Sequence, residues 1–133
     1  MRKNINKKFL IGKIAKKYSL ELILLFGSQV ESKTHPNSDL DIAILPKTNR
    51  DYNWDRYSSL ISDFSKAFSV KKIDLVFINE ANPLLLKKIC DNTLLVFGNQ
   101  KTFTELRLKA FKYFQDYLPY FKLEEAAIHQ YLK

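Results

Sequence analysis

The chain has 133 residues, of which 46% are hydrophobic, and a formal net charge of +8 at pH 7. This length suits a single domain with a hydrophobic core, and only three glycines and four prolines exclude collagen-like and low-complexity chains. The positive charge favours anionic partners such as nucleotides, RNA or an acidic protein surface, but charge alone does not separate these from a solvated basic surface.

Cysteine content and hydropathy bear on disulfides, zinc sites and membrane spans. The only cysteine, Cys90, has no partner for an internal disulfide, and its simplest role is that of a small buried apolar residue. One cysteine with His35 and His129 is too few for the usual zinc ligand sets. No apolar run approaches the roughly 18 residues of a membrane span, and lysines interrupt the first apolar stretch. We therefore expect a cytoplasmic protein.

The first half of the chain alternates between helical spacing and short apolar runs. Apolar residues recur every three or four positions in the first segment, which is typical of an amphipathic helix. Short continuous apolar runs that end at Gly27 and Pro46 are typical of buried strands. The predicted elements are a helix over residues 4–18, a strand over 21–26, a short helix over 28–32, a loop over 34–38 and a strand over 40–45.

The second half continues the alternation. The predicted elements are a helix capped within residues 48–51 and ending near 68, a strand over 73–78, a helix over 83–91 capped by Asn82, a weaker strand over 94–97, and a helix from 102 onward. Pro119 should kink or split the last helix. One helical stripe is expected to be core: Trp54, Tyr57, Leu60, Ile61, Phe64 and Phe68. Four tyrosines of the last helix are expected to pack, with a partner-docking face as the second option: Tyr113, Tyr117, Tyr120 and Tyr131.

Acidic residues stand at the start of two predicted strands. Asp39 and Asp41 alternate onto one face of a strand that is otherwise apolar, and Asp74 lies alone among the apolar residues of another strand. Buried acids are costly unless they are paired or bound to a metal ion. Such acids suit Mg²⁺, and two ions about 3.5–4 Å apart would assist an in-line displacement. The Gly27-Ser28 turn would bring backbone N–H groups close to an anion.

Alternatives at these positions remain open. Asp39 could cap a turn and Asp41 could pair with a lysine, and each acid taken alone is more often structural than catalytic. The combination with Gly27-Ser28 and Asp74 favours a site.

These motifs resemble the nucleotidyltransferase superfamily that includes DNA polymerase β. The resemblance rests on Gly27-Ser28, ten further residues, Asp39-Leu40-Asp41 and a later strand acid at Asp74. The whole chain is similar to the minimal nucleotidyltransferases (MNT domains), the MntA-type antitoxins of HEPN–MNT toxin–antitoxin modules. The resemblance implies an α/β (α+β) nucleotidyltransferase fold over residues 1–133. This fold has a small mixed sheet flanked by helices, and a C-terminal helical segment over about 101–133.

The resemblance also implies a reaction. Such antitoxins transfer AMP from ATP to a tyrosine hydroxyl of a HEPN ribonuclease toxin, with release of pyrophosphate. Gly27 and Ser28 would hold the triphosphate, and Asp39 and Asp41 would ligate two Mg²⁺ ions. Asp74 would complete the second metal site and help to deprotonate the hydroxyl. The implied partners are ATP and the toxin, with no membrane and no direct nucleic-acid binding.

The sequence departs from the family pattern between its two motifs. Gln29 stands where an Arg is usual, and Glu31-Ser32 where a Gly is usual. The first change implies weaker nucleotide binding or a lysine elsewhere that takes over, and the second implies a differently shaped loop. Two other functions stay open. One is transfer to a small hydroxylated molecule or an RNA end, and the other is an antitoxin that acts by binding alone.

Overall fold

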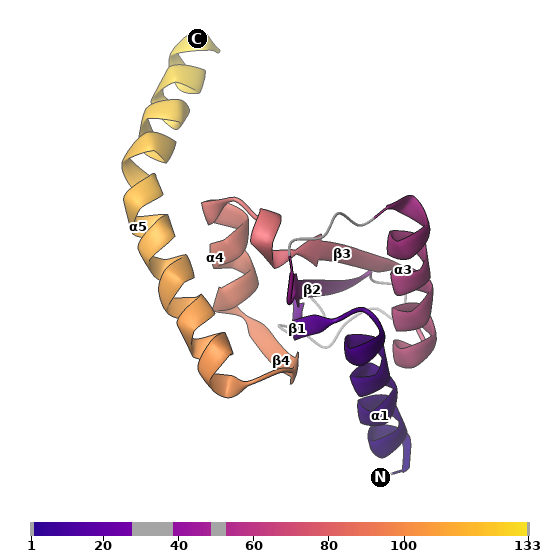
Figure 1. Cartoon of the computed structure of the whole chain (residues 1–133). Helices are drawn as coiled ribbons and strands as arrows, with labels where there is room; N and C mark the ends of the chain where they lie inside the picture. Colours follow the sequence, from indigo (N-terminus) through magenta and orange to yellow (C-terminus); the bar gives the residue numbers. More distant parts are fainter. Residues whose placement is uncertain (1, 28–38, 49–52, 133) are drawn as a thin grey trace.

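A computed structural model describes residues 2–27, 39–48 and 53–132, of which residues 2–6 are described as backbone only. Its elements are α1 (Arg2–Lys17), β1 (Leu20–Phe26), β2 (Leu40–Pro46), α3 (Trp54–Phe68), β3 (Ile73–Phe77), the 3₁₀ helix η1 (Ile78–Glu80), α4 (Pro83–Asp91), β4 (Thr93–Phe97) and α5 (Gln100–Tyr131). Three layers result, in which a sheet separates α1 and α3 from α4 and α5 (Figure 1).

The sheet is mixed and has the strand order β3-β2-β1-β4. β1 pairs antiparallel with both β2 and β4, whereas β2 pairs parallel with β3. Helices cover both faces, which explains why β1 and β2 are nearly continuous apolar runs. The predicted alternation of β2 is confirmed, because Leu40, Ile42 and Ile44 pack with α1 and α3 while Ala43 and Leu45 pack with α4 and α5. The predicted fold class is therefore confirmed.

Several predicted boundaries are wrong in detail. Helix α3 begins at Trp54 instead of within 48–51, because the side chain of Asn53 accepts a hydrogen bond from the backbone N–H of Arg56 at 2.8 Å. Trp54 is 76% exposed, so it is not a core residue; it stacks on Tyr57 at the start of the helix. Ile78 begins η1 and does not extend β3. The helix and loop predicted over 28–38 lie outside the described residues.

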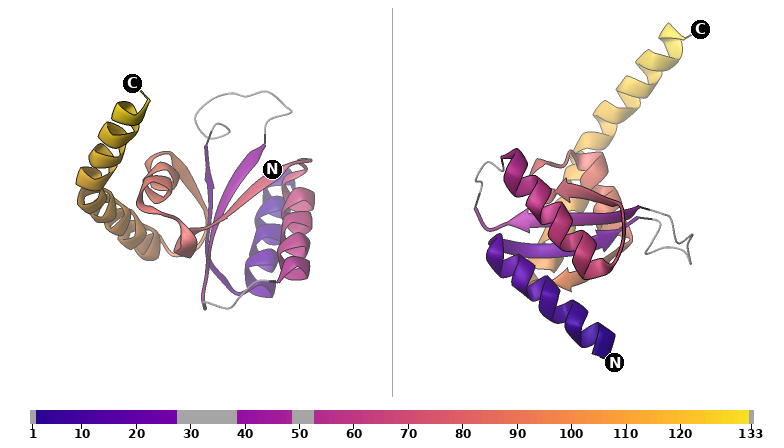
Figure 2. Two further views of the ribbon diagram at one scale, coloured as in Figure 1. Left: turned by 90° about the horizontal axis from the view of Figure 1, so that it is seen from above. Right: turned by 90° about the vertical axis from the view of Figure 1, so that its right-hand side faces the viewer.

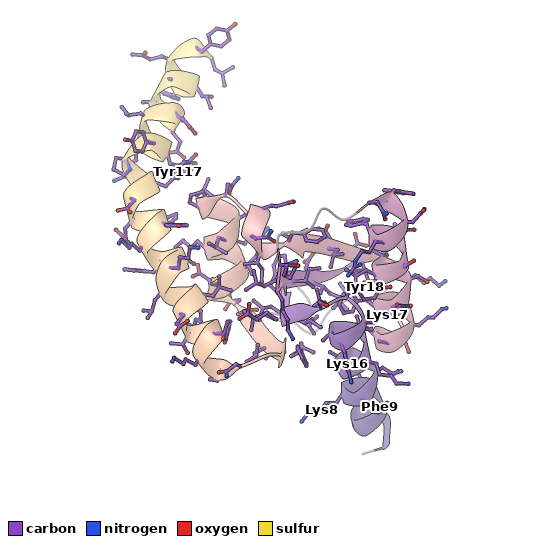
Figure 3. The ribbon with its side chains drawn as sticks, viewed as in Figure 1. Lys8, Phe9, Lys16, Lys17, Tyr18 and Tyr117 are labelled. Carbon is purple, nitrogen blue, oxygen red and sulfur yellow. The ribbon has the colours of Figure 1, made fainter. Side chains whose placement is uncertain are left out.

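Helix α5 contacts the body of the protein only along its first part. Phe103, Leu106 and Ala110 are buried, and beyond them the helix extends away from α4 (Figures 1 and 2). The helix continues through Pro119, so it is not split, and its ribbon changes direction near Tyr117 (Figure 3). Three tyrosines predicted to pack are exposed, at 45%, 65% and 90%: Tyr113, Tyr120 and Tyr131. Nothing in the described structure covers this part of the stripe.

A polar contact joins α1 to α3. The Tyr18 hydroxyl donates to Asp63 Oδ2 at 2.7 Å, and the Lys17 amine donates to the same oxygen at 3.1 Å. Burial raises the pKa of Asp63, but the hydrogen bonds from Tyr18 and Lys17 outweigh it and hold the pKa below its usual value. Asp63 therefore holds the end of α1 against α3 by accepting these two hydrogen bonds.

Two sequence predictions about setting can be compared with the structure. Cys90 is buried, as predicted, and burial raises the pKa of its thiol to about 11. Among the described residues, none of the helices has the length and apolarity that crossing a membrane requires.

Candidate functional site

The register of β2 and β3 brings two predicted site residues together. Asp41 is the direct partner of Asp74 in the parallel ladder, and neighbouring strands lie about 4.8 Å apart. Both residues alternate onto the face that packs against α4 and α5, together with Ala43 and Val76. Two carboxylates are therefore side by side where β2 and β3 begin.

Gly27 completes this corner of the site from β1. Phe26, the last residue of β1, pairs with Asp41, and Gly27 follows with φ of +85°. A Cβ on Gly27 would lie 2.1 Å from Oδ2 of Asp41, so the glycine backbone rests directly against this carboxylate. Only glycine combines this backbone conformation with such a close approach.

The electrostatics of the pair agree with its geometry. Burial raises the pKa of Asp41, and the neighbouring carboxylate of Asp74 raises it further. The charge of Lys88 acts in the opposite direction, and Asp39 contributes a smaller upward effect. Asp41 therefore lies in a place where its negative charge lacks full compensation.

Not every predicted residue joins the pair. Asp39 precedes β2 and is exposed, and Ser28 lies outside the described residues together with Gln29 and Glu31-Ser32. In the part of the chain that the structure describes, no three His, Cys, Asp or Glu side chains form a cluster suited to a metal ion. Of the three acids expected to form a cage, Asp41 and Asp74 are side by side on one face of the sheet, and Asp39 is exposed just before β2.

The pair itself fits a hard divalent cation. Mg²⁺ prefers oxygen ligands and is commonly held by one or two carboxylates together with substrate phosphates and water. Asp41 and Asp74 supply two such groups in adjacent strands, and the raised pKa of Asp41 indicates a demand for positive charge. The donor set therefore suits Mg²⁺ that arrives with a polyphosphate.

Lys88 was not identified from the sequence. It lies in α4, close enough for its charge to lower the pKa of Asp41. Its neighbour Lys87 instead pairs with Asp91. Helical spacing in α4 marks Leu86 and Ile89 as buried but carries no sign that Lys88 approaches an acid on a strand that is far away in sequence.

Comparisons with known proteins identify the family of the chain. The family model described as polymerase beta, nucleotidyltransferase, matches residues 10–102. The protein adenylyltransferase MntA of Shewanella oneidensis is 31% identical over 84 residues, which span 62% of this chain and 57% of that relative.

Solved structures extend the likeness to most of the chain. A toxin–antitoxin crystal structure with AMP-PNP matches with a TM-score of 0.72 and 25% identity, over 94% of this chain and 97% of that one. The tri-AMPylated Shewanella oneidensis HEPN toxin in complex with MNT antitoxin gives a TM-score of 0.68 at 23% identity over 98% of both chains, and this likeness concerns the fold alone. The family model covers well over half of the residues. The chain belongs to the polymerase β nucleotidyltransferase family.

Proposed function

We propose that this chain is an antitoxin that transfers AMP from ATP to a tyrosine hydroxyl of a HEPN ribonuclease toxin. The observation that supports it most is the pairing of Asp41 with Asp74 in register, beside the Gly27 backbone, in a chain of this family. The relative that shares 31% identity over 84 residues is a protein adenylyltransferase, and a solved relative is a toxin–antitoxin complex with AMP-PNP.

The proposed reaction is an in-line displacement. The tyrosine oxygen attacks the α-phosphorus of ATP, the bond from that phosphorus to the bridging oxygen of the β-phosphate breaks, and pyrophosphate leaves. Asp74 accepts the proton of the tyrosine hydroxyl. Asp39, Asp41 and Asp74 would hold Mg²⁺, and the ion would neutralise phosphate charge. The backbone at Gly27 and Ser28 positions the outer phosphates.

The outer part of α5 offers a surface for the toxin. Exposed apolar side chains gather there, among them Phe111, Tyr120, Leu123 and Ile128. Because the match to the solved toxin–antitoxin complex covers 94% of this chain, it includes most of α5. Exposed aromatic and aliphatic groups of this kind are typical of protein interfaces.

The proposal is tested by incubating the protein with labelled ATP, Mg²⁺ and a candidate HEPN toxin. We expect the mass of the toxin to rise by whole AMP units on tyrosine, and its ribonuclease activity to fall in step. Neutralisation without any added mass would establish an antitoxin that acts by binding alone. Label that appears on a small hydroxylated molecule or an RNA end, and not on the toxin, would contradict the proposed acceptor.

Lys88 is proposed to supply the positive charge that the family usually takes from an Arg after the Gly-Ser pair. We expect Lys88→Gln to raise the KM for ATP about tenfold, since one charge contact to phosphate is removed. The matched control is Lys87→Gln on the same helix, because Lys87 pairs with Asp91. Steady-state AMP transfer at varied ATP concentration measures both. Equal KM values for the two variants would show that Lys88 does not contact ATP.

A further inference from the structure

The positive charge of the chain is concentrated on one helix. Seven of the 22 Lys and Arg residues and none of the 14 acidic residues lie in α1, so this helix has a formal charge of +7 out of the net +8. The seven are Arg2, Lys3, Lys7, Lys8, Lys13, Lys16 and Lys17. The remainder of the chain is almost neutral. Nearly all of the net positive charge of the chain therefore lies on α1.

Helix stability explains Lys16 and Lys17, which lie in the last turn where basic residues favour the macrodipole, but it does not explain the basic start of the helix. The first turn of α1 contains no acid, although basic residues at a helix start oppose the macrodipole. Membrane attachment does not explain it either, because the apolar side of α1 is already used: Ile11, Ile14 and Ala15 are buried in the core shared with α3. Lys17 pairs with Asp63, but Lys8, Lys13 and Lys16 are exposed and can meet an anionic partner in solution.

The exposed side of α1 has open space at Gly12, between two lysines. Gly12 has no atom within 4 Å of the position that a Cβ would take. Lys8 and Lys16, one turn before and one turn after it, are exposed on the same side of the helix. Figure 3 labels both lysines on α1, and Lys8 extends away from α3. A glycine inside a helix costs about 1 kcal/mol relative to alanine, but here it leaves the backbone accessible to a ligand.

An exposed aromatic ring lies on the same side of α1, one turn before Gly12. Phe9, three residues before Gly12, is 61% exposed, and the amine of Lys13 lies 5.0 Å from its ring centroid. Lys13 also lines, with Lys17 and Lys66, a hollow of about 220 Å³ between α1 and α3. Asp63, which accepts a hydrogen bond from Lys17, lines the same hollow. Proteins that bind single-stranded nucleic acids commonly present exposed aromatic rings among basic residues, because bases stack on the ring while phosphates contact the amines.

We propose that the exposed surface of α1, formed by Lys8, Phe9, Gly12, Lys13 and Lys16, binds single-stranded nucleic acid. This surface lies across the sheet from Asp41 and Asp74, which face α4 and α5, so it is separate from the nucleotidyl-transfer site and goes beyond the proposed function (Figure 2). The proposal reverses the sequence-based expectation of no direct nucleic-acid binding.

The test is fluorescence anisotropy of a labelled oligouridylate RNA of about 15 nucleotides, a length within the usual range of single-strand sites. We expect the triple variant Lys8→Glu, Lys13→Glu, Lys16→Glu to bind at least tenfold more weakly. The slope of log affinity against log salt should fall by about 2, since each phosphate contact contributes about 0.7 for single strands. The matched control Lys109→Glu, Lys112→Glu, Lys122→Glu has the same charge change on α5 and should bind within about threefold of the wild type.

The ring is tested separately by a second matched pair. Phe9→Ala should weaken RNA binding about tenfold, whereas Phe111→Ala, at 62% exposure on α5, should not. Oligothymidylate DNA should bind as RNA does, and inorganic polyphosphate, which has no bases, should compete poorly. Circular dichroism and melting temperature verify that each variant folds, and AMP transfer should be unchanged in the α1 variants.

Three results would overturn the proposal. The first is equal loss of RNA binding in the α1 and α5 triple variants, which indicates a general charge effect. The second is polyphosphate competition as strong as that of RNA, combined with no effect of Phe9→Ala. The third is intact RNA binding in the α1 triple variant with loss of toxin capture, which would assign the surface to an acidic protein.

Discussion

Asp41→Asn should abolish AMP transfer and leave the protein slightly more stable. Asp41 and Asp74 are direct neighbours in register, and burial together with Asp74 raises the pKa of Asp41. The amide keeps the shape of the side chain but removes the negative charge that would bind a cation, and the phosphates would bind through that cation. We expect a loss of about 10³-fold or more, comparable with the removal of a principal electrostatic group from other active sites.

The gain in stability follows from the same geometry. A raised pKa means that folded Asp41 binds its proton more tightly than unfolded Asp41. The contribution of Asp41 to the free energy of unfolding therefore falls as the pH rises above the pKa that Asp has in the unfolded chain. At neutral pH, removing one of two like charges that face each other should stabilise the fold by about 0.2–1 kcal/mol. Thermal melting without divalent ions measures this effect.

Magnesium provides the control for the stability change. Mg²⁺ with ATP should raise the melting temperature of the wild type but not of Asp41→Asn, and EDTA should abolish the difference. Asp91→Asn, which changes an exposed acid that pairs with Lys87, should transfer AMP at the wild-type rate. If Asp41→Asn transfers AMP within tenfold of the wild type, Asp41 is not a metal ligand.

Gly27→Ala should lower both activity and stability. The residue has φ of +85°, where an L side chain is strained, and its new Cβ would lie 2.1 Å from Oδ2 of Asp41. That contact is relieved only if the carboxylate moves away from its place beside Asp74. We expect AMP transfer to fall about 100-fold, by analogy with small displacements of catalytic groups, and unfolding free energy to fall by about 1–2 kcal/mol.

Gly12→Ala is the matched control for this substitution. The same methyl group meets open space on α1, so it should stabilise the protein by up to about 1 kcal/mol and leave AMP transfer unchanged. Chemical denaturation and the toxin-modification assay, applied to both variants, separate a general effect of losing glycine from the effect at the site. A Gly27→Ala protein with normal activity would mean that the carboxylate of Asp41 does not need its observed position.

The predictable part of the fold is the part that a local pattern determines. Continuous apolar runs identified β1 and β2, and the Asn82-Pro83 pair identified the start of α4, since each signal depends on neighbours in the chain. Alternation also placed Asp41 and Asp74 each on the correct face of its strand. Their meeting was not derivable from alternation, because it requires β2 and β3 to be parallel neighbours in register.

The errors have a common physical cause. An apolar stripe shows which side of a helix would be buried, but not whether another element covers it. Trp54 continues the stripe of α3 beyond the edge of the core, and Tyr120 and Tyr131 continue that of α5 beyond the last covering helix, so all three are exposed. The approach of Lys88 to Asp41 could not be predicted from the helical pattern of α4, because Asp41 belongs to a strand that is distant in sequence.

The outward extension of α5 has a consequence for how the isolated protein behaves over time. The helix has 32 residues, and its buried positions end at Ala110. A helical segment without tertiary support is only marginally stable in water, so the outer turns should open often. Amide hydrogens beyond Phe114 should therefore exchange with solvent much faster than those around Leu106, and a bound toxin should slow them. Proteases would then cut the free chain first at its outer α5 turns, and the lifetime of the protein would depend on whether it is bound.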